Sequence, residues 1–217
     1  MIPARRQAIG ADQVTYTVKE IFLTAQGEGG NIGRTAVFIR FAGCNLWSGR
    51  EEDRAKAVCR FCDTDFLGGS RYADPDELAD AAAALWPPAP HRMAVLTGGE
   101  PLLQVDSALI AALRARDFYI AVETNGTQPL PARVDWLCVS PKAGAPLVLS
   151  HADELKLVYP QPGAEPERFT EFSAPHRWLS PMDSAARAEN TRAAAAYCLA
   201  HPEWRLAIQA HKTWGIP

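Results

Sequence analysis

The sequence predicts an α/β fold in which a mostly parallel sheet with few helices forms an incomplete, TIM-like β/α barrel. Short apolar, β-branched runs alternate with stretches of helical composition, which is typical of parallel strands joined by right-handed crossovers. Several runs are continuously apolar, as expected of strands covered on both faces. A complete (β/α)8 barrel usually takes about 250 residues. This chain has 217 residues and only three credible long helices, so we expect the barrel to be partial.

Seven runs are predicted as strands because aliphatic, aromatic and β-branched residues dominate them. In chain order they cover residues 36–41, 93–96, 119–122, 136–139, 155–159, 177–179 and 205–208. Most of these runs are followed by a polar or glycine-rich cluster. Because ligands of barrel-like α/β folds lie at the carboxyl ends of the strands, we expect the clusters to converge on one mouth. They occupy residues 43–45, 97–101, 123–126, 140–142, 180–183 and 209–212.

Three helices are predicted between these strands. The first begins after Asp74, an N-cap residue, with Pro75 in its first turn and Glu77 completing a pattern that resembles a capping box. It ends at residues 87–88, a Pro-Pro pair that cannot continue a helix. The other two helices are expected over about residues 105–116 and 185–199.

Composition predicts a globular cytoplasmic protein of one domain. Hydrophobic residues make up 47% of the chain, and the formal net charge is −3 with a pI of about 6.0. A domain that grips nucleic acid is usually strongly basic, so we expect no nucleic-acid partner. No apolar run reaches the length of a membrane span, and the two arginines near the start precede no signal-peptide core. We expect residues 1–15 to form a loose extension and residues 16–217 a single domain.

Three of the five cysteines cluster in the first third of the chain. Cys59 and Cys62 form a C-x2-C pair, and Cys44 lies upstream. Three thiolates from one loop suit an iron–sulfur cluster or a zinc ion, although a closed zinc site generally needs a fourth protein ligand, and none is nearby. Cys138 and Cys198 lie in an apolar strand and an Ala-rich helix, and we expect both in the core.

The cysteine loop and the motif T-G-G-E-P at residues 97–101 resemble those of radical S-adenosylmethionine enzymes. Three further motifs narrow the resemblance: Q-G-E-G at 26–29, F-A-G-C-N-L-W at 41–47 and C-D-T-D at 62–65. Together they are similar to the 7-carboxy-7-deazaguanine synthase family over about residues 16–217. The superfamily's usual first spacing is C-x3-C, whereas residues 45–58 here separate the first two cysteines, an expanded form of the cluster loop (residues 43–68) that some members of the family carry.

The resemblance implies a [4Fe-4S] cluster on Cys44, Cys59 and Cys62, with the fourth iron binding S-adenosylmethionine. Reduction of the bound nucleoside would give methionine and a 5′-deoxyadenosyl radical. Gly99 would let the backbone pass close to the methionine moiety. Many relatives have Gln where this chain has Ser180. The residues implied in cofactor binding are Phe61, Asp63, Gly99, Glu123, Asn125, Ser140, Pro141, Lys142, Ser180, Pro181, Met182 and Asp183.

By the same resemblance, the enzyme is a lyase that converts 6-carboxy-5,6,7,8-tetrahydropterin to 7-carboxy-7-deazaguanine with loss of ammonia, in 7-deazapurine (queuosine) biosynthesis. Thr64 would ligate Mg²⁺ together with the substrate. Arg40 suits a bidentate grip on a carboxylate, the alternative being an ion pair with Glu28 or Glu123. The general base stays unassigned, with His211 as a candidate. The residues implied in substrate binding are Ala25, Gln26, Gly27, Glu28, Arg40, Thr97, His211 and Pro217.

Two alternatives stay open at this point. One is another small radical enzyme, such as an activase of a glycyl-radical protein. The other is a non-catalytic zinc-binding module, which lacks an evident fourth ligand. The resemblance also implies a homodimer and an external electron donor of the flavodoxin or ferredoxin type, and we expect no membrane partner.

Overall fold

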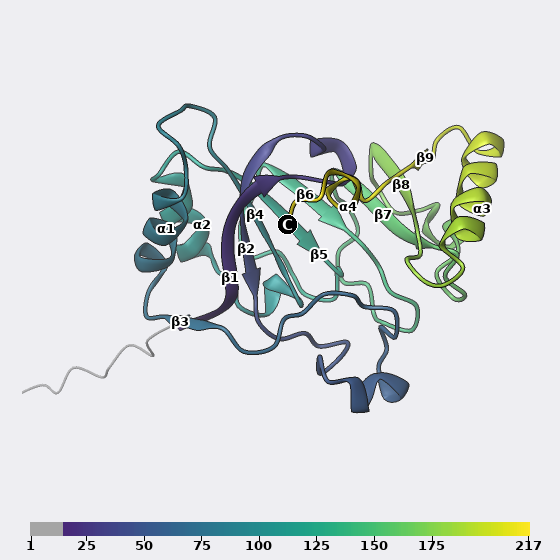
Figure 1. The fold of residues 1–217 in the computed structure, drawn as a ribbon, viewed down its shortest axis with the longest axis horizontal. Coiled ribbons are helices and arrows are strands. Elements are labelled where there is room, and N and C mark those ends of the chain that lie inside the picture. The colour runs from purple at the N-terminus through teal and green to yellow at the C-terminus, as the bar shows by residue number, and fades with distance from the viewer. Residues whose placement is uncertain (1–14) are drawn as a thin grey trace, which may run out of the picture.

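A nine-stranded sheet runs through residues 15–217, the part of the chain that the computed structural model describes (Figure 1). Its strand order is β3-β1-β2-β4-β5-β6-β7-β8-β9. From β2 to β9 each neighbouring pair is parallel, whereas β1 pairs antiparallel with β2 and with β3. The strands are β1 Tyr16–Ala25, β2 Thr35–Phe41, β3 Ser70–Tyr72, β4 Met93–Gly98, β5 Tyr119–Thr124, β6 Trp136–Val139, β7 Glu154–Tyr159, β8 His176–Pro181 and β9 Arg205–Leu206.

The sheet is open, with β3 and β9 at its edges, so the predicted partial barrel is confirmed. All seven predicted strands are present, although the run at 205–208 is strand only over β9. The sequence prediction missed β1 and β3. In β1, Lys19 and Glu20 interrupt the apolar run because the strand borders a cavity and the solvent along much of its length. Such a half-exposed antiparallel strand lacks the continuous apolar signature of its parallel neighbours.

The three predicted helices are present with shifted ends. They are α1 Pro75–Ala84, α2 Ser107–Arg114 and α3 Arg187–Ala200. Asp74 caps α1 by accepting a hydrogen bond from the Glu77 backbone N–H at 2.8 Å. The Glu77 carboxylate reaches back to the Ala73 N–H at 2.6 Å. A short helix that was not predicted, α4 Ala210–Trp214, ends the chain, and four 3-10 turns cover η1 Gly29–Asn31, η2 Glu51–Lys56, η3 Pro101–Leu103 and η4 Pro166–Phe169.

Alternate residues of the central strands face two different sides of the sheet. Ala94 and Leu96 of β4 belong to the main apolar core, which also contains Leu109 and Leu113 of α2. Met93 and Val95 form a second, smaller cluster on the opposite, inner face with residues of β2 and β5. The helices α1 and α2 pack together beside the first half of the sheet and α3 lies at the other end (Figure 1). The inner face is therefore free to carry polar side chains beyond its small apolar cluster.

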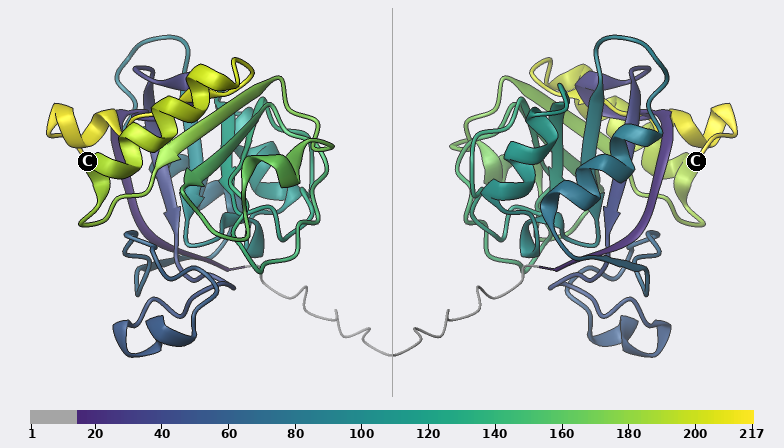
Figure 2. Two further views of the ribbon diagram at one scale, coloured as in Figure 1. Left: turned by 90° about the vertical axis from the view of Figure 1, so that its right-hand side faces the viewer. Right: turned by 90° about the vertical axis from the view of Figure 1, so that its left-hand side faces the viewer.

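The loop that carries the three clustered cysteines projects from one end of the sheet, as both views in Figure 2 show. No described helix is long and apolar enough to cross a membrane. The N-terminal extension predicted for residues 1–15 lies, except for Thr15, outside the described residues.

Candidate functional site

Polar side chains continue the inner face of the sheet toward the carboxyl ends of the strands. Arg40, Thr97 and Glu123 each lie two residues beyond a side chain of the inner apolar cluster. Lys156 shares this face, because Glu123 pairs with Cys138 of β6, Cys138 pairs with Glu154 of β7, and Lys156 lies two residues after Glu154. Two adjacent cavities open there, a smaller one of about 230 Å³ and a larger one of about 480 Å³. The predicted convergence of the polar clusters on one mouth is borne out by this geometry.

The smaller cavity is lined by the three clustered cysteines and by most of the residues predicted to hold the cofactor. Pro141 and Met182 do not line it. The backbone N–H of Met182 instead donates to the Tyr159 carbonyl at 2.8 Å, which ties β8 to β7. The predicted residues that line this cavity are Cys44, Cys59, Phe61, Cys62, Asp63, Thr64, Gly99, Glu123, Asn125, Ser140, Lys142, Ser180, Pro181 and Asp183.

The three thiols face the smaller cavity and are soft donors of the kind that an iron–sulfur cluster or a zinc ion takes. All three cysteines belong to the described residues, and at least two of their sulfur atoms lie more than 4.8 Å apart. Thiolates on one tetrahedral zinc ion stand roughly 3.8 Å apart, given Zn–S bonds of about 2.3 Å. The Cys59 thiol donates a hydrogen bond to the Cys62 sulfur, which lowers the pKa of Cys62 to about 6. Burial raises the pKa of Cys44.

The glycine pair at the end of β4 is required by contacts within the protein itself. A Cβ on Gly99 would lie 2.0 Å from the Gly43 carbonyl oxygen and 3.0 Å from the Cβ of Cys44. Gly98 has a φ of +133°, and its Cβ would lie 2.2 Å from the Phe41 carbonyl oxygen. The glycines therefore let the end of β4 pack directly on the cysteine loop, a reason that applies before any cofactor binds.

The glutamate of the T-G-G-E-P motif joins strand ends around the smaller cavity. Glu100 is fully buried and accepts hydrogen bonds from the Thr124 hydroxyl and the Asn125 backbone N–H, both at 2.7 Å. The Asn125 side chain in turn donates to Asn45 in the cysteine loop at 3.1 Å. Burial raises the pKa of Glu100 in spite of these bonds. Glu100 thus fixes β4, β5 and, through Asn125, the cysteine loop relative to one another.

The expanded part of the cysteine loop is tied to the segment that carries Cys59 and Cys62. Arg54, in η2, donates to the carbonyl oxygens of Arg60 at 2.9 Å and Cys62 at 3.1 Å. Its guanidinium also lies 4.1 Å from the ring centroid of Trp47, which lines the smaller cavity. The insertion therefore supports the cysteine loop through Arg54, which hydrogen-bonds to two backbone carbonyl groups and makes a cation–π contact with Trp47.

All eight residues predicted for substrate binding line the larger cavity. Arg40 differs from the prediction in its partner: its Nε atom pairs with Glu20 of the adjacent strand β1 at 2.7 Å, not with Glu28 or Glu123. Glu20 is half exposed. The eight residues are Ala25, Gln26, Gly27, Glu28, Arg40, Thr97, His211 and Pro217.

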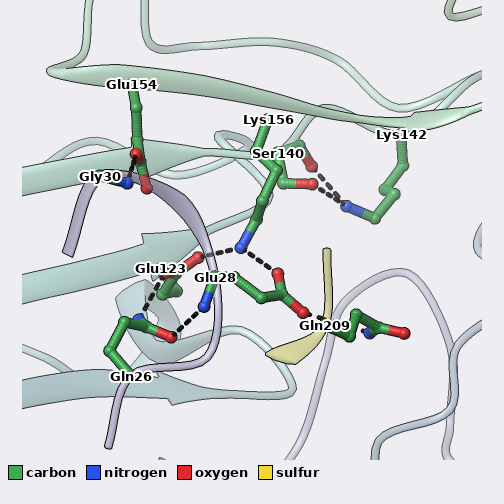
Figure 3. A network of polar contacts seen from close by, with 9 residues as sticks. All are labelled: Gln26, Glu28, Gly30, Glu123, Ser140, Lys142, Glu154, Lys156 and Gln209. Atoms are coloured by element: carbon green, nitrogen blue, oxygen red, sulfur yellow. Dashed lines mark hydrogen bonds and ion pairs between the residues drawn. The ribbon is translucent and has the colours of Figure 1, made fainter. Parts of the chain in front are cut away.

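The loop after β1 is held by buried polar contacts (Figure 3). The Gln26 amide donates to Glu123 at 3.2 Å and accepts from the Glu28 backbone N–H at 3.1 Å. The buried Glu154 carboxylate accepts from the Gly30 N–H at 2.8 Å. A Cβ on Gly27 would lie 2.4 Å from the Nδ1 atom of His211, so the loop and α4 are packed together.

Two ion pairs of Lys212 connect helix α4 to the wall of the smaller cavity. Lys212 pairs with Asp63, next to the last cysteine of the loop, at 3.1 Å, and with Asp183, at the end of β8. These contacts lower the pKa of Asp183 and raise that of Lys212. Two predicted cofactor residues are thereby connected through a lysine that the sequence analysis did not single out.

The two cavities share six residues, here called the shared wall. Lys156 is its one cation, and its ammonium pairs with Glu28 at 2.7 Å and Glu123 at 2.8 Å. Gln209 belongs to the predicted polar cluster 209–212, but no role was predicted for it. Lys156 was not predicted, although a lysine inside an apolar strand such as 155–159 is a signal that a buried charge needs partners. The shared wall consists of Glu28, Asp63, Thr64, Glu123, Lys156 and Gln209.

Comparison with known proteins places the chain in a family. The model of the radical SAM superfamily matches residues 54–153. The 7-carboxy-7-deazaguanine synthase of Caulobacter vibrioides is 60% identical over 210 residues, which are 94% of this chain and 100% of the relative. The protein of the same name from Bordetella pertussis is 56% identical over 210 residues, again 94% of this chain and 100% of the relative. The crystal structure of QueE from Escherichia coli has a TM-score of 0.66, is 24% identical, and covers 91% of this chain and 95% of its own, so the fold is common to both.

Proposed function

The chain belongs to the 7-carboxy-7-deazaguanine synthase family of radical SAM enzymes, and from this premise we propose that it converts 6-carboxy-5,6,7,8-tetrahydropterin to 7-carboxy-7-deazaguanine with loss of ammonia. The reaction makes it a carbon–nitrogen lyase and serves 7-deazapurine (queuosine) formation. The observation that carries the proposal is the shared wall, since a cavity with three cluster-type thiols adjoins one with an arginine and paired carboxylates.

Membership of the superfamily implies a [4Fe-4S] cluster and S-adenosylmethionine. When bound, these groups supply the radical chemistry that removes a hydrogen atom from the substrate. Cys44, Cys59 and Cys62 would hold the cluster. Half-buried Lys142 donates to the Ser140 hydroxyl at 2.8 Å and lines the same cavity. Its ammonium would add positive charge beside the three thiols, two of which, Cys59 and Cys62, counter the lowering of the Lys142 pKa by desolvation.

On the substrate side, Arg40 would bind the carboxylate, because a guanidinium donates two parallel hydrogen bonds to such a group. The Glu28 carboxylate would accept hydrogen bonds from ring N–H groups. Glu123, which the resemblance implies in cofactor binding, lines both cavities and would also accept from the substrate ring. His211, packed on Gly27 at the rim, would hold or move a proton, and Pro217, whose carbonyl oxygen accepts from Thr24 at 2.8 Å, would close the same side.

We assign the Mg²⁺ ligand to Thr64, which belongs to the shared wall. Its hydroxyl oxygen is the hard donor type that Mg²⁺ takes, and the ion commonly keeps several waters with few protein ligands. The ion would orient the substrate carboxylate. A homodimer, a cytoplasmic location and an external donor of the flavodoxin or ferredoxin type are proposals that rest on the family resemblance alone.

The test is anaerobic reconstitution with iron and sulfide, followed by reduction with S-adenosylmethionine, Mg²⁺ and 6-carboxytetrahydropterin. Mass spectrometry should then detect 7-carboxy-7-deazaguanine, and omission of Mg²⁺ should lower its yield. A brown protein that cleaves S-adenosylmethionine but leaves the pterin intact would keep the radical class and reject the proposed substrate.

A further inference from the structure

Lys156 lies where the contents of the two cavities have to meet. It belongs to β7 and lines both cavities, with its side chain 11% exposed. Any ligand of the smaller cavity that reacts with a ligand of the larger one must do so across the shared wall. The groups at this wall therefore touch or border the reacting atoms, whichever substrate is bound.

The Lys156 ammonium joins two carboxylates that come from distant parts of the chain. Glu28 belongs to the loop after β1 and Glu123 to β5, and each side chain is 17% exposed. The second oxygen of each carboxylate accepts an amide hydrogen bond, from Gln209 to Glu28 at 3.1 Å and from Gln26 to Glu123 at 3.2 Å (Figure 3). Both carboxylates are thus held in fixed orientations by one cation and two amides.

Acidic groups around the ammonium outnumber cations. On the inner face, Glu123 of β5, Cys138 of β6 and Glu154 of β7 bring their ligand atoms within 4.8 Å of one another. Because an ammonium already lies beside this group, we do not regard it as a metal site. Lys142, after β6, hydrogen-bonds to Ser140 rather than to a carboxylate.

The pKa values of the two carboxylates shift in opposite directions, because one ammonium lies beside several acidic groups. The Lys156 ammonium holds the pKa of Glu28 below its usual value against the effect of burial, and His211 of α4 adds to this. Burial and the neighbouring Glu154 and Glu28 charges raise the pKa of Glu123 in spite of Lys156. The ammonium lowers the pKa of both groups, so its removal would raise both.

We propose that Lys156 is a positioning residue that fixes the Glu28 and Glu123 carboxylates as a pair of hydrogen-bond acceptors for the N–H groups of a small heterocyclic substrate at the shared wall. The inference rests on the proposed function for the identity of that substrate. A lysine that served only to neutralise buried charge would affect folding without setting how substrate binding depends on pH.

The test compares Lys156→Met, which keeps the side-chain length without the charge, with Lys156→Arg, which keeps the charge. Lys56→Met is the matched control, because it removes the same charge from the exposed end of η2. Binding of 6-carboxytetrahydropterin to each reconstituted protein with S-adenosylmethionine is measured anaerobically by titration calorimetry between pH 5 and 8. Iron content and S-adenosylmethionine affinity are measured on the same samples.

We expect Lys156→Met to keep its iron and to bind the pterin about tenfold more weakly, a larger loss than the variant shows in its affinity for S-adenosylmethionine. The pH at which binding is lost on the acid side should rise by about one unit, because two carboxylates lose their cation. Lys156→Arg should restore the wild-type pH profile in part, and Lys56→Met should match the wild type.

The inference would be overturned if Lys156→Met bound the pterin with wild-type affinity and lost binding at the same acidic pH as the wild type. If that variant does not fold, the charge-balanced double variant Lys156→Met with Glu123→Gln replaces it. Its binding should still be lost at a higher pH than that of the wild type, because Glu28 alone then lacks its cation. The wild-type titration separates the two possible failures. Absence of pterin binding by the wild type overturns the proposed function and this inference together, whereas wild-type binding with an unmoved variant overturns the inference alone.

Discussion

The smaller and larger cavities adjoin each other but are built in different ways. The smaller cavity takes its thiols and its close backbone packing from short contiguous segments, the cysteine loop and residues 97–101. The larger cavity collects single side chains from separate elements, among them Arg40 of β2, Thr97 of β4 and Lys156 of β7. Changes in one cavity should therefore impair one kind of ligand while leaving the other in place, and the following variants test that separation.

The largest effect is expected for Cys59→Ala. Loss of one of three thiolates should remove the cluster and with it both S-adenosylmethionine cleavage and product formation. Iron per chain and the visible absorbance of the reconstituted protein measure this directly. Cys198→Ala is the control, because Cys198 lies on α3 outside both cavities. Full activity in Cys59→Ala would reject the cluster assignment.

Arg40→Ala should act on the larger cavity alone. Truncating a charged partner of a carboxylate costs about 2–5 kcal/mol, which corresponds to a fall in kcat/KM of roughly 30- to 5,000-fold. Iron content should stay at the wild-type level. Glu20→Gln removes the half-exposed partner of Arg40 and should cost far less. An Arg40→Ala enzyme with the wild-type KM for the pterin would show that another group binds the carboxylate.

Arg54→Met should weaken the cluster from outside the smaller cavity. The variant loses hydrogen bonds to the carbonyl oxygens of Arg60 and Cys62 and the contact with Trp47. We expect the cluster absorbance to decay about threefold faster in air, a loss equivalent to under 1 kcal/mol. Arg50→Met is matched to it, because Arg50 is exposed in the same loop with only a 3.8 Å pairing to Glu52. Equal decay in both variants would remove the supporting role from Arg54.

Glu123→Gln should change how stability depends on pH. The pKa of Glu123 is raised in the folded protein, so the stability that its proton uptake contributes is present below the unfolded pKa of about 4.5 and is lost as pH rises through the folded pKa. The Tm of Glu123→Gln relative to wild type should therefore rise between pH 5 and 8, by about 2–4 °C for each 1 kcal/mol.

Glu28→Gln is the opposite case, because the pKa of Glu28 is lowered. The stability that Glu28 contributes is present above its unfolded pKa and is lost as pH falls through the lower folded value. Its Tm difference from wild type should be constant above about pH 5.5. The same slope in both variants would contradict the assignment of opposite shifts to the two carboxylates.

The difference between the cavities also explains what could be predicted from sequence. The parallel strands, the Asp74 cap and the cysteine loop are local patterns, and each was recognisable from adjacent residues. The pairing of Lys156 with Glu28 joins residues that are far apart in the chain, and no spacing rule connects them. Arg40 illustrates the same limit. Its position in a strand was predicted, but its partner Glu20 was not, because the apolar pattern did not reveal strand β1.

If the two ligands react across the shared wall, an isotope label carried by the substrate should reach the cofactor. Substrate carrying deuterium at C6 is turned over anaerobically by the reconstituted enzyme, and the S-adenosylmethionine that remains is analysed by mass spectrometry. Abstraction of the hydrogen atom at C6, followed by return of a hydrogen atom that regenerates the cofactor, would place deuterium in the recovered S-adenosylmethionine in step with product formation. Product that forms while all of the deuterium appears in solvent would show that no hydrogen atom passes between the ligands across the shared wall.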